Sequence, residues 1–279
     1  MQLMTAYDPN LYDYTAGQGK VRDALADFRE AFAKLRIAYT MARQDFAGRY
    51  RGTALGGLWI TVTTAMTALG LGLLYSQIFE RSIKEHLPYV AVGIVIWTTI
   101  SMLLLEGSTS FVGGSHTFKQ MRAPLSLFLL RVFIRNFFVF CFRALILIPL
   151  LSITTRPGLS DYALALLGLA TLYVSGFWVA VGLGVLTARF RDVGQLTGAA
   201  TTFFFFLTPV FWRPDRLGEY AYLIDYNPFY HCLEIVRAPL VSGESVLDHY
   251  AVVGAIAAVT SVVSFCLYAA FFRRLPYWC

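Results

Sequence analysis

Few residues in this sequence have the types and spacing needed for chemistry, and four of them are charged side chains inside long apolar stretches. Glu106 lies in one stretch, Arg131 and Arg135 lie one helical turn apart in the next, and Arg143 follows two turns later. A charge inside a bilayer costs about 2.5–3.5 kcal/mol on insertion scales, so it faces a partner or a polar cavity. We expect Glu106 to pair with Arg131 or Arg135 and fix helix packing. Arg143 either lines a polar route for an anion or bonds to backbone carbonyls.

Motifs for the common catalytic chemistries do not occur in the sequence. There is no G-x-x-x-x-G-K-S/T loop for ATP, no H-E-x-x-H metal motif and no G-x-S-x-G nucleophile motif. His86, His116, His231 and His249 lie far apart in the sequence, and each is expected to be a loop residue rather than a catalyst. We therefore expect no catalytic residue, metal site or cofactor in this chain.

The charged residues lie within a chain dominated by apolar stretches of membrane-spanning length. The chain is 57% hydrophobic and 14% charged, whereas soluble domains carry about 25% charged residues. A bilayer core near 30 Å needs about 20 residues of helix, and helices satisfy every backbone polar group internally. The sequence therefore predicts an all-α integral membrane protein. The predicted spans are about 55–79, 87–112, 127–151, 161–187, 196–212 and 250–272.

A periodic segment precedes the first predicted span. Apolar or small side chains recur every three or four residues from Val21 to Phe46, which lines one face of a helix. Asp23 and Asp27 fall on the opposite, charged face. We predict an amphipathic interface helix at 21–47, because the first span follows within ten residues of its end. Residues 1–20 are expected to form a flexible arm, and 21–279 a single transmembrane domain.

The segment 213–249 is too long for a turn and too apolar for a free loop. Asn227 followed by Pro228 predicts a helix cap and a first helical residue. Phe229 and Leu233 continue at helical spacing. Two short helices that dip toward the bilayer and return fit this pattern, and two surface helices without a gating role fit it as well.

Basic residues are unevenly distributed among the loops. Fourteen lysines and arginines fall in the N-terminal segment, the loops at 113–126 and 188–195 and the C-terminal tail, against six in the other loops. Basic residues concentrate on the cytoplasmic side of membrane proteins. Both termini are therefore expected in the cytoplasm, with 213–249 outside. In such a protein the net charge of +6 does not indicate nucleic acid as a partner.

Several segments follow one another in a specific order and spacing. They begin in the run from Arg43 to Trp59 and continue at Glu106-Gly107, then at Ala188 to Val193 and Leu207 to Trp212, and they end in Asn227 to Pro239. Together these segments resemble the permease subunits of type-2 ABC exporters, in particular those that export lipid-linked polysaccharides such as O-antigen and teichoic acid.

The resemblance implies a homodimer that binds two copies of a separate ABC ATPase subunit, which holds ATP and Mg²⁺. It also implies an interface helix, six spans, short cytoplasmic coupling segments and an external gate. The expected setting is the bacterial inner membrane, among membrane lipids. The expected substrate is a polysaccharide on undecaprenyl diphosphate or a similar lipid. An exporter of a drug or lipid with the same fold is the alternative, and an ion-coupled carrier or a membrane-embedded glycan enzyme is a more distant one.

Four groups of residues carry this interpretation. Aromatic faces suit a sliding sugar polymer and also suit lipid. Arginine forks at the start of the first span suit a diphosphate and also suit anionic-lipid anchoring. A basic-rimmed apolar loop suits docking to the ATPase, and it is otherwise a solvated loop.

The predicted channel residues are Trp59, Tyr75, Phe203, Phe204, Phe205, Phe206 and Phe211, and the predicted phosphate residues are Arg43, Arg49 and Arg51. The predicted coupling residues are Phe118, Lys119, Gln120, Met121, Arg122, Arg189, Arg191 and Asp192, and the predicted gate residues are Tyr226, Asn227, Pro228, Phe229 and Tyr230.

Overall fold

The computed structural model describes residues 20–114, 123–243 and 246–278, and it contains helices but no strand within those ranges. The predicted coupling residues Phe118 to Arg122 lie outside the described residues. Five helical segments are long and apolar enough to cross a membrane. The prediction of an all-α integral membrane protein is therefore confirmed. The five segments are α3 (Leu58–Ile78), α4 (Ile83–Ser108), α7 with α8 (Ser126–Ala144 and Leu147–Ile153), α9 (Leu159–Arg189) and α12 with its C-terminal extension (Leu247–Phe271, continuing to Trp278).

The predicted span at 196–212 takes a shorter form. Helix α10 (Asp192–Leu207) has 16 residues, which corresponds to about 24 Å at 1.5 Å per residue. The helix ends because Thr208 precedes Pro209, and a residue before proline is disfavoured in the helical conformation. Thr208 has an extended backbone, with φ −92° and ψ 135°. Residues 208–213 therefore leave the helix and turn back toward α4.

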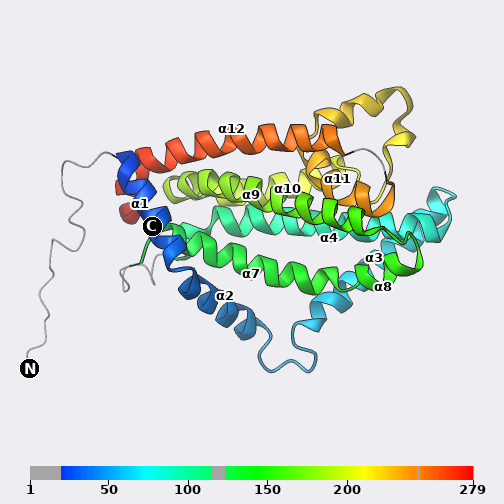
Figure 1. The fold of residues 1–279 in the computed structure, drawn as a ribbon, viewed down its shortest axis with the longest axis horizontal. Coiled ribbons are helices and arrows are strands. Elements are labelled where there is room, and N and C mark those ends of the chain that lie inside the picture. The colour runs from blue at the N-terminus through cyan, green and yellow to red at the C-terminus, as the bar shows by residue number, and fades with distance from the viewer. Residues whose placement is uncertain (1–19, 115–122, 244–245, 279) are drawn as a thin grey trace, which may run out of the picture.

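Helices α4 and α9 form the centre of the bundle (Figure 1). Helix α9 packs against α12, α4 and α11 (Pro228–Val241), and α4 also packs against α3 and α7. Close approach depends on small residues at the contacts, as in other membrane helix pairs. A Cβ on Gly107 of α4 would lie 2.5 Å from the Cβ of Ala180 on α9. Any larger residue at 107 would push the two central helices apart.

The two ends of the bundle carry different elements (Figure 1). One end, here called the α1 end, holds α1 (Lys20–Ala33), α5 (Ser110–Gly113), η3 (Phe272–Arg274) and α13 (Leu275–Trp278). The opposite end, here called the gate end, holds α8, α11 and η2 (Pro214–Tyr226), the last of which is drawn in yellow. The first described residues and the C-terminal residues thus lie at the same end of the molecule.

The predicted interface helix at 21–47 is two helices, α1 and α2 (Leu35–Arg49), with a break at Lys34. The large apolar side chains of the predicted stripe point mostly outward: Val21, Phe32 and Tyr39 are exposed. Small residues such as Ala24 and Ala38 pack inward instead. The segment therefore presents an apolar outer face, as an interfacial helix does. Asp23 and Asp27 lie opposite this apolar face, as predicted, and both are buried against the bundle.

Asp27 is buried because it caps a transmembrane helix from a distance. Its carboxylate accepts hydrogen bonds from the backbone N–H groups of Leu125 (2.8 Å) and Ser126 (3.0 Å) at the start of α7. It also accepts from the hydroxyls of Ser126 (2.5 Å) and Tyr268 of α12 (2.7 Å). The first N–H groups of a helix have no partner within the helix, and a carboxylate there is favourable. Burial raises the pKa of Asp27, and the bonds from Ser126, Tyr268 and Leu125 offset that effect in part.

Replacing Asp27 with Asn is expected to destabilise the fold. The amide would turn N–H donors toward the donors of Leu125 and Ser126, and leaving a buried donor unsatisfied costs about 1–3 kcal/mol. The free energy of unfolding can be measured by denaturant titration in mixed micelles. Glu30→Gln is the matched control, because Glu30 lies on the same helix in an exposed pair with Lys34 and should change stability by less than about 0.5 kcal/mol. Equal stability of the two variants would contradict the capping role.

Candidate functional site

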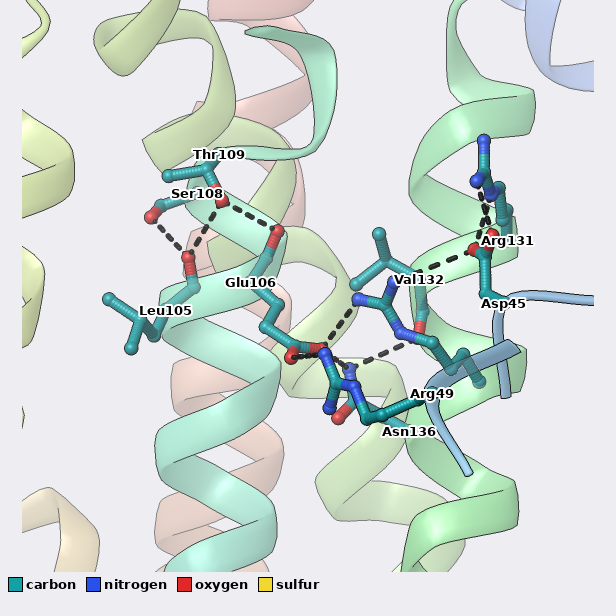
Figure 2. Close-up of polar contacts among 10 residues, drawn as sticks. Asp45, Arg49, Leu105, Glu106, Ser108, Thr109, Arg131, Val132 and Asn136 are labelled. Carbon is teal, nitrogen blue, oxygen red and sulfur yellow. Dashed lines mark hydrogen bonds and ion pairs between the residues drawn. The ribbon is translucent and has the colours of Figure 1, made fainter. Parts of the chain in front are cut away.

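A cluster of charged residues joins α2, α4 and α7 near the α1 end of the bundle (Figure 2). It is called here the arginine–carboxylate cluster. Helix α2 contributes two members in its last turn, α4 contributes one close to its C-terminus, and α7 contributes three. Its members are Asp45, Arg49, Glu106, Arg131, Arg135 and Asn136.

Arg131 and Asp45 form the tightest pair of the cluster. The Arg131 Nε–Asp45 Oδ2 distance is 2.6 Å and the Nη2–Oδ1 distance is 2.5 Å, so the guanidinium binds both carboxylate oxygens. Both side chains are largely shielded from solvent, with 25% and 20% exposed. A bidentate pair of this kind fixes orientation as well as distance. Asp45 therefore holds α2 in one register against α7.

Glu106 is paired with Arg135 rather than with Arg131. The Arg135 Nη2–Glu106 Oε2 distance is 2.7 Å, and the Asn136 amide donates to the same oxygen at 2.9 Å. Arg135 also approaches Asp45 at 3.5 Å, which links the two halves of the cluster. Of the two pairings that the sequence left open, the structure has Glu106 with Arg135. The partner of Arg131, Asp45, was missed because it precedes the first predicted span.

The cluster carries more positive than negative charge. Three arginines face two carboxylates, and Arg49 is the outermost, about half exposed and 3.7 Å from Glu106. An anion approaching this face would therefore meet an incompletely neutralised guanidinium. Arg43 and Arg51 are exposed, and neither forms an ion pair within the described ranges. The structure thus brings one of the three predicted phosphate residues into the cluster.

Arg143 lies two helical turns further along α7. It makes no hydrogen bond or ion pair with any residue that the structure describes, and its side chain is half-buried. The interpretation that it bonds to backbone carbonyls of the same subunit is therefore not observed. Its role as a lining residue of a polar route stays a prediction.

The predicted wall phenylalanines divide into two pairs. Phe204 and Phe205 pack against the hydrophobic core, whereas Phe203 and Phe206, three residues apart on one helical face, are 63% and 65% exposed. Phe204 contacts the predicted gate residue Phe229 with tilted rings, whose centroids lie 4.8 Å apart. Phe204 therefore links α10 to α11, Phe205 packs toward Trp97 of α4, and the outer pair is free to meet lipid, another subunit or a substrate.

The inner pair belongs to a continuous set of rings, called here the aromatic cluster. Phe205 contacts Phe211 at 5.5 Å, and Phe211 contacts Tyr75 of α3 at 4.6 Å. Trp97 of α4 completes the set by contacting both Phe205 and Phe229. Trp59 lies outside this cluster and is 44% exposed. Trp97 was missed because nothing in its local sequence separates it from an ordinary core residue.

Asn227 starts α11 as predicted. Its side chain accepts a hydrogen bond from the backbone N–H of Phe229 at 3.0 Å, and Pro228 is the first helical residue. The same side chain donates to the hydroxyl of Thr208 at 3.0 Å, immediately after α10. One residue thus joins the end of α10 to the start of α11. Tyr226, at the end of η2, is exposed and Tyr230 is half-buried.

A buried ion pair on α11 was not predicted as part of the site. Arg237 is 1% exposed and pairs with Glu234, one helical turn earlier. Its guanidinium also lies over the ring of Tyr89, 3.7 Å from the centroid, and donates to the carbonyl of Pro209 at 2.7 Å. Buried charges need this degree of pairing to be tolerated. The signal in the sequence was an acidic and a basic residue three positions apart within an apolar helix.

Two of the histidines are in contact, and both lie in helices, α11 and α12, rather than in the predicted loops. The Nδ1 atoms of His231 and His249 lie 2.8 Å apart, and Nε2 of His231 contacts the carbonyl of Asp225 at 2.8 Å. Their distance of eighteen positions along the chain hid this contact. His86 also differs from its prediction as a loop residue, because it is buried in the first turns of α4. Among the described residues, no group of three or more potential ligands could hold a metal ion.

The second predicted coupling segment lies at the α1 end, between α9 and α10. The guanidinium of Arg189 lies over the ring of Trp278, 5.2 Å from the centroid, and Arg191 donates to the carbonyl of Trp278 at 3.2 Å. Asp192 is the first residue of α10 and is exposed. The turn is therefore accessible and supported by the C-terminal helix α13.

Comparison with known proteins identifies the family. Residues 38–241 match the family model described as ABC-2 type transporter. The chain belongs to the ABC-2 type transporter family. The chain is also similar to the O-antigen export system permease protein RfbA of Myxococcus xanthus, with 22% identity over 194 residues, which are 68% of this chain and 74% of that protein. The resemblance seen in the sequence is thus confirmed at the level of an ABC-2 permease.

Membership in the ABC-2 family defines the general role of the chain. Permeases of this family are multi-pass membrane subunits for transport, and the family implies partnership with an ABC ATPase subunit. The five apolar helices agree with that role. The matched region begins within α2 and ends with α11. It therefore includes the arginine–carboxylate cluster, the aromatic cluster and the buried ion pair of α11 in this permease.

A double-mutant cycle on Asp45 and Arg131 is expected to show strong coupling. Each of Asp45→Asn and Arg131→Gln leaves a shielded charge without its partner, and the double variant removes both charges. We expect the two losses in unfolding free energy to be non-additive by about 1–3 kcal/mol. The exposed pair Glu30–Lys34 is the control and should couple by about 0.3–0.5 kcal/mol. Additive losses at Asp45 and Arg131 would show that the bidentate pair does not hold α2 on α7.

Proposed function

We propose that this chain is the transmembrane subunit of an ATP-driven exporter of lipid-linked polysaccharide. In this proposal two copies form the membrane channel, and two copies of an ABC ATPase subunit bind the cytoplasmic face. The complex moves an O-antigen-like polymer on undecaprenyl diphosphate, or a similar lipid, from the cytoplasmic to the periplasmic side of the bacterial inner membrane. In the same proposal both termini lie in the cytoplasm.

The observation that carries the substrate class is the similarity to an O-antigen export permease. This similarity extends over 68% of the chain, so it is not confined to one helix. The geometry of the α1 end supports an anionic lipid headgroup. Arg49 stands on the rim of a cluster with excess positive charge, at the junction between the apolar outer face of α1 and α2 and the first span. A lipid diphosphate at the membrane interface fits such a position, since guanidinium groups match phosphate geometry.

The exposed aromatic residues support a polymer pathway. Phe203 and Phe206 form an outward-facing pair on α10, and Trp59 is exposed on α3. Rings offer sugars a favourable face without a fixed hydrogen-bond register, so a chain can slide. A second subunit placed over α3 and α10 would turn these rings toward a shared channel.

The proposal can be tested with the purified complex. The tagged chain should copurify with an ABC ATPase subunit in a two-to-two complex, and lipid-linked polysaccharide should stimulate ATP hydrolysis in proteoliposomes. Undecaprenyl phosphate without sugar serves as the control for a detergent-like effect. Stimulation by amphipathic drugs or phospholipid, with none by lipid-linked polysaccharide, would contradict the proposed substrate.

Alanine replacements across the four phenylalanines of α10 should separate two kinds of effect. Phe203→Ala and Phe206→Ala should impair polymer export while leaving basal ATP hydrolysis unchanged and lowering stability little, because these rings are largely exposed and touch Phe204 and Phe205 from the outside. Phe204→Ala and Phe205→Ala should lower the free energy of unfolding by about 2–4 kcal/mol, because each leaves a cavity in the aromatic cluster. Export in proteoliposomes and unfolding in micelles measure the two effects. Normal export by the folded Phe203→Ala and Phe206→Ala variants would place these rings against lipid.

A further inference from the structure

A shallow pocket at the gate end lies where the α3–α4 turn meets the start of η2. Its lining combines two arginines, a histidine, an aspartate and one aromatic ring. The lining residues are Phe79, Arg81, His86, Arg213 and Asp215. None of these residues belongs to the arginine–carboxylate cluster or to the residues assigned to export above.

His86 is the most unusual member of this pocket. The residue is 1% exposed, and neither ring nitrogen makes a hydrogen bond of normal geometry with a described residue; the backbone of Phe211 offers only a weaker contact. Its ring lies between Phe79, at a centroid distance of 5.9 Å, and Tyr89, at 6.2 Å. A buried imidazole without a partner is costly, and every tautomer offers at least one N–H donor. The ring is therefore held in place by its neighbours at the lining of the pocket.

The two arginines of the pocket are held by an aromatic ring and by a carboxylate. The guanidinium of Arg213 lies over the Tyr89 ring at 4.7 Å, and its Nε is buried without a hydrogen-bond partner among the described residues. Arg81 follows Glu80, whose φ of 52° ends α3 in a left-handed turn. Arg81 donates to Asp215 at 2.6 Å. Two guanidiniums and an imidazole thus converge on a site that contains one carboxylate.

We propose that this pocket is a binding site for a phosphate group, with Asp215 as the internal counter-ion that the phosphate replaces. The Arg81–Asp215 pair is accessible, with side chains 36% and 49% exposed, and exposed pairs of this kind are weak and exchangeable. A phosphate offers several acceptor oxygens, enough for Arg81, Arg213 and the unpaired His86 together. Its two negative charges balance the two arginines better than the single charge of Asp215.

Phosphate binding would act on the gate segment because Asp215 belongs to η2. When phosphate takes Arg81, the link between η2 and the α3–α4 turn is released. The source of the phosphate is either a lipid headgroup or a free phosphate group, since the same donors serve both. Binding at this site does not depend on which polymer the protein exports, and its measurement needs neither nucleotide nor polymer.

The test is phosphate binding to the intact chain in phosphate-free maltoside micelles, with inorganic phosphate as the probe and constant ionic strength. Calorimetry or ³¹P line broadening gives the dissociation constant. Asp215→Asn should bind about threefold to tenfold more tightly, because a competing carboxylate is removed. Arg81→Gln and Arg213→Gln should each weaken binding by about tenfold or more, because a charge-assisted hydrogen bond is lost. Lys84→Gln is the matched control, since it removes one positive charge from the first turn of α4, outside the pocket.

A further variant separates loss of phosphate binding from loss of the fold. His86→Phe keeps an aromatic ring between Phe79 and Tyr89 but removes both nitrogens, so it should fold normally and bind phosphate several-fold more weakly. Short-chain phosphatidylglycerol then distinguishes the sources: displacement of bound phosphate assigns the site to lipid headgroups, and no displacement assigns it to free phosphate. Equal weakening by Lys84→Gln and Arg213→Gln, or no tightening by Asp215→Asn, would overturn the proposal.

Discussion

Carboxylates on the N-terminal helices link those helices to the transmembrane bundle, and much of the α1 end depends on these links. Asp23 pairs with Arg273 at 2.9 Å, Asp27 caps α7, and Asp45 binds Arg131. Each contact joins α1 or α2 to a segment more than 80 residues away in the chain. Because the three carboxylates are shielded from water, removing the groups that they bind would leave a buried negative charge uncompensated, which is costly.

The same physical requirement shapes the gate end with different chemistry. Arg237 is buried and satisfied by Glu234, by the ring of Tyr89 and by the carbonyl of Pro209. The carbonyl is available because α10 stops at Leu207 and the chain folds back against α4. Gly93 permits this contact, since a Cβ there would overlap the carbonyl of Val210. The short α10, the small residue on α4 and the buried arginine thus form one arrangement.

The two ends consequently differ in how easily they can rearrange. The contacts of Asp27 and Arg131 are buried or shielded and made by several hydrogen bonds each. Among the described residues, η2 is linked to the α3–α4 turn by the accessible ion pair Arg81–Asp215, beside His86, whose ring nitrogens make no hydrogen bond of normal geometry there. Local openings draw on the least stable contacts of a protein. The contact between η2 and the α3–α4 turn is therefore the more easily broken of these contacts.

The sequence by itself determined the membrane class, most span positions and the start of α11. These features follow from local properties: apolar runs of bilayer length, and an Asn-Pro pair that caps a helix wherever it occurs. The resemblance to ABC-2 permeases also came from linear segments. Tertiary structure alone decided which partner each charge takes. Asp27 reads locally as a surface residue and becomes buried because the start of α7 needs an acceptor. Glu106 had two arginines within reach, and the position of Asp45 on α2 decided between them. Partner choice depends on helix rotation and on contacts across the bundle, and neither is encoded in the spacing of neighbouring residues.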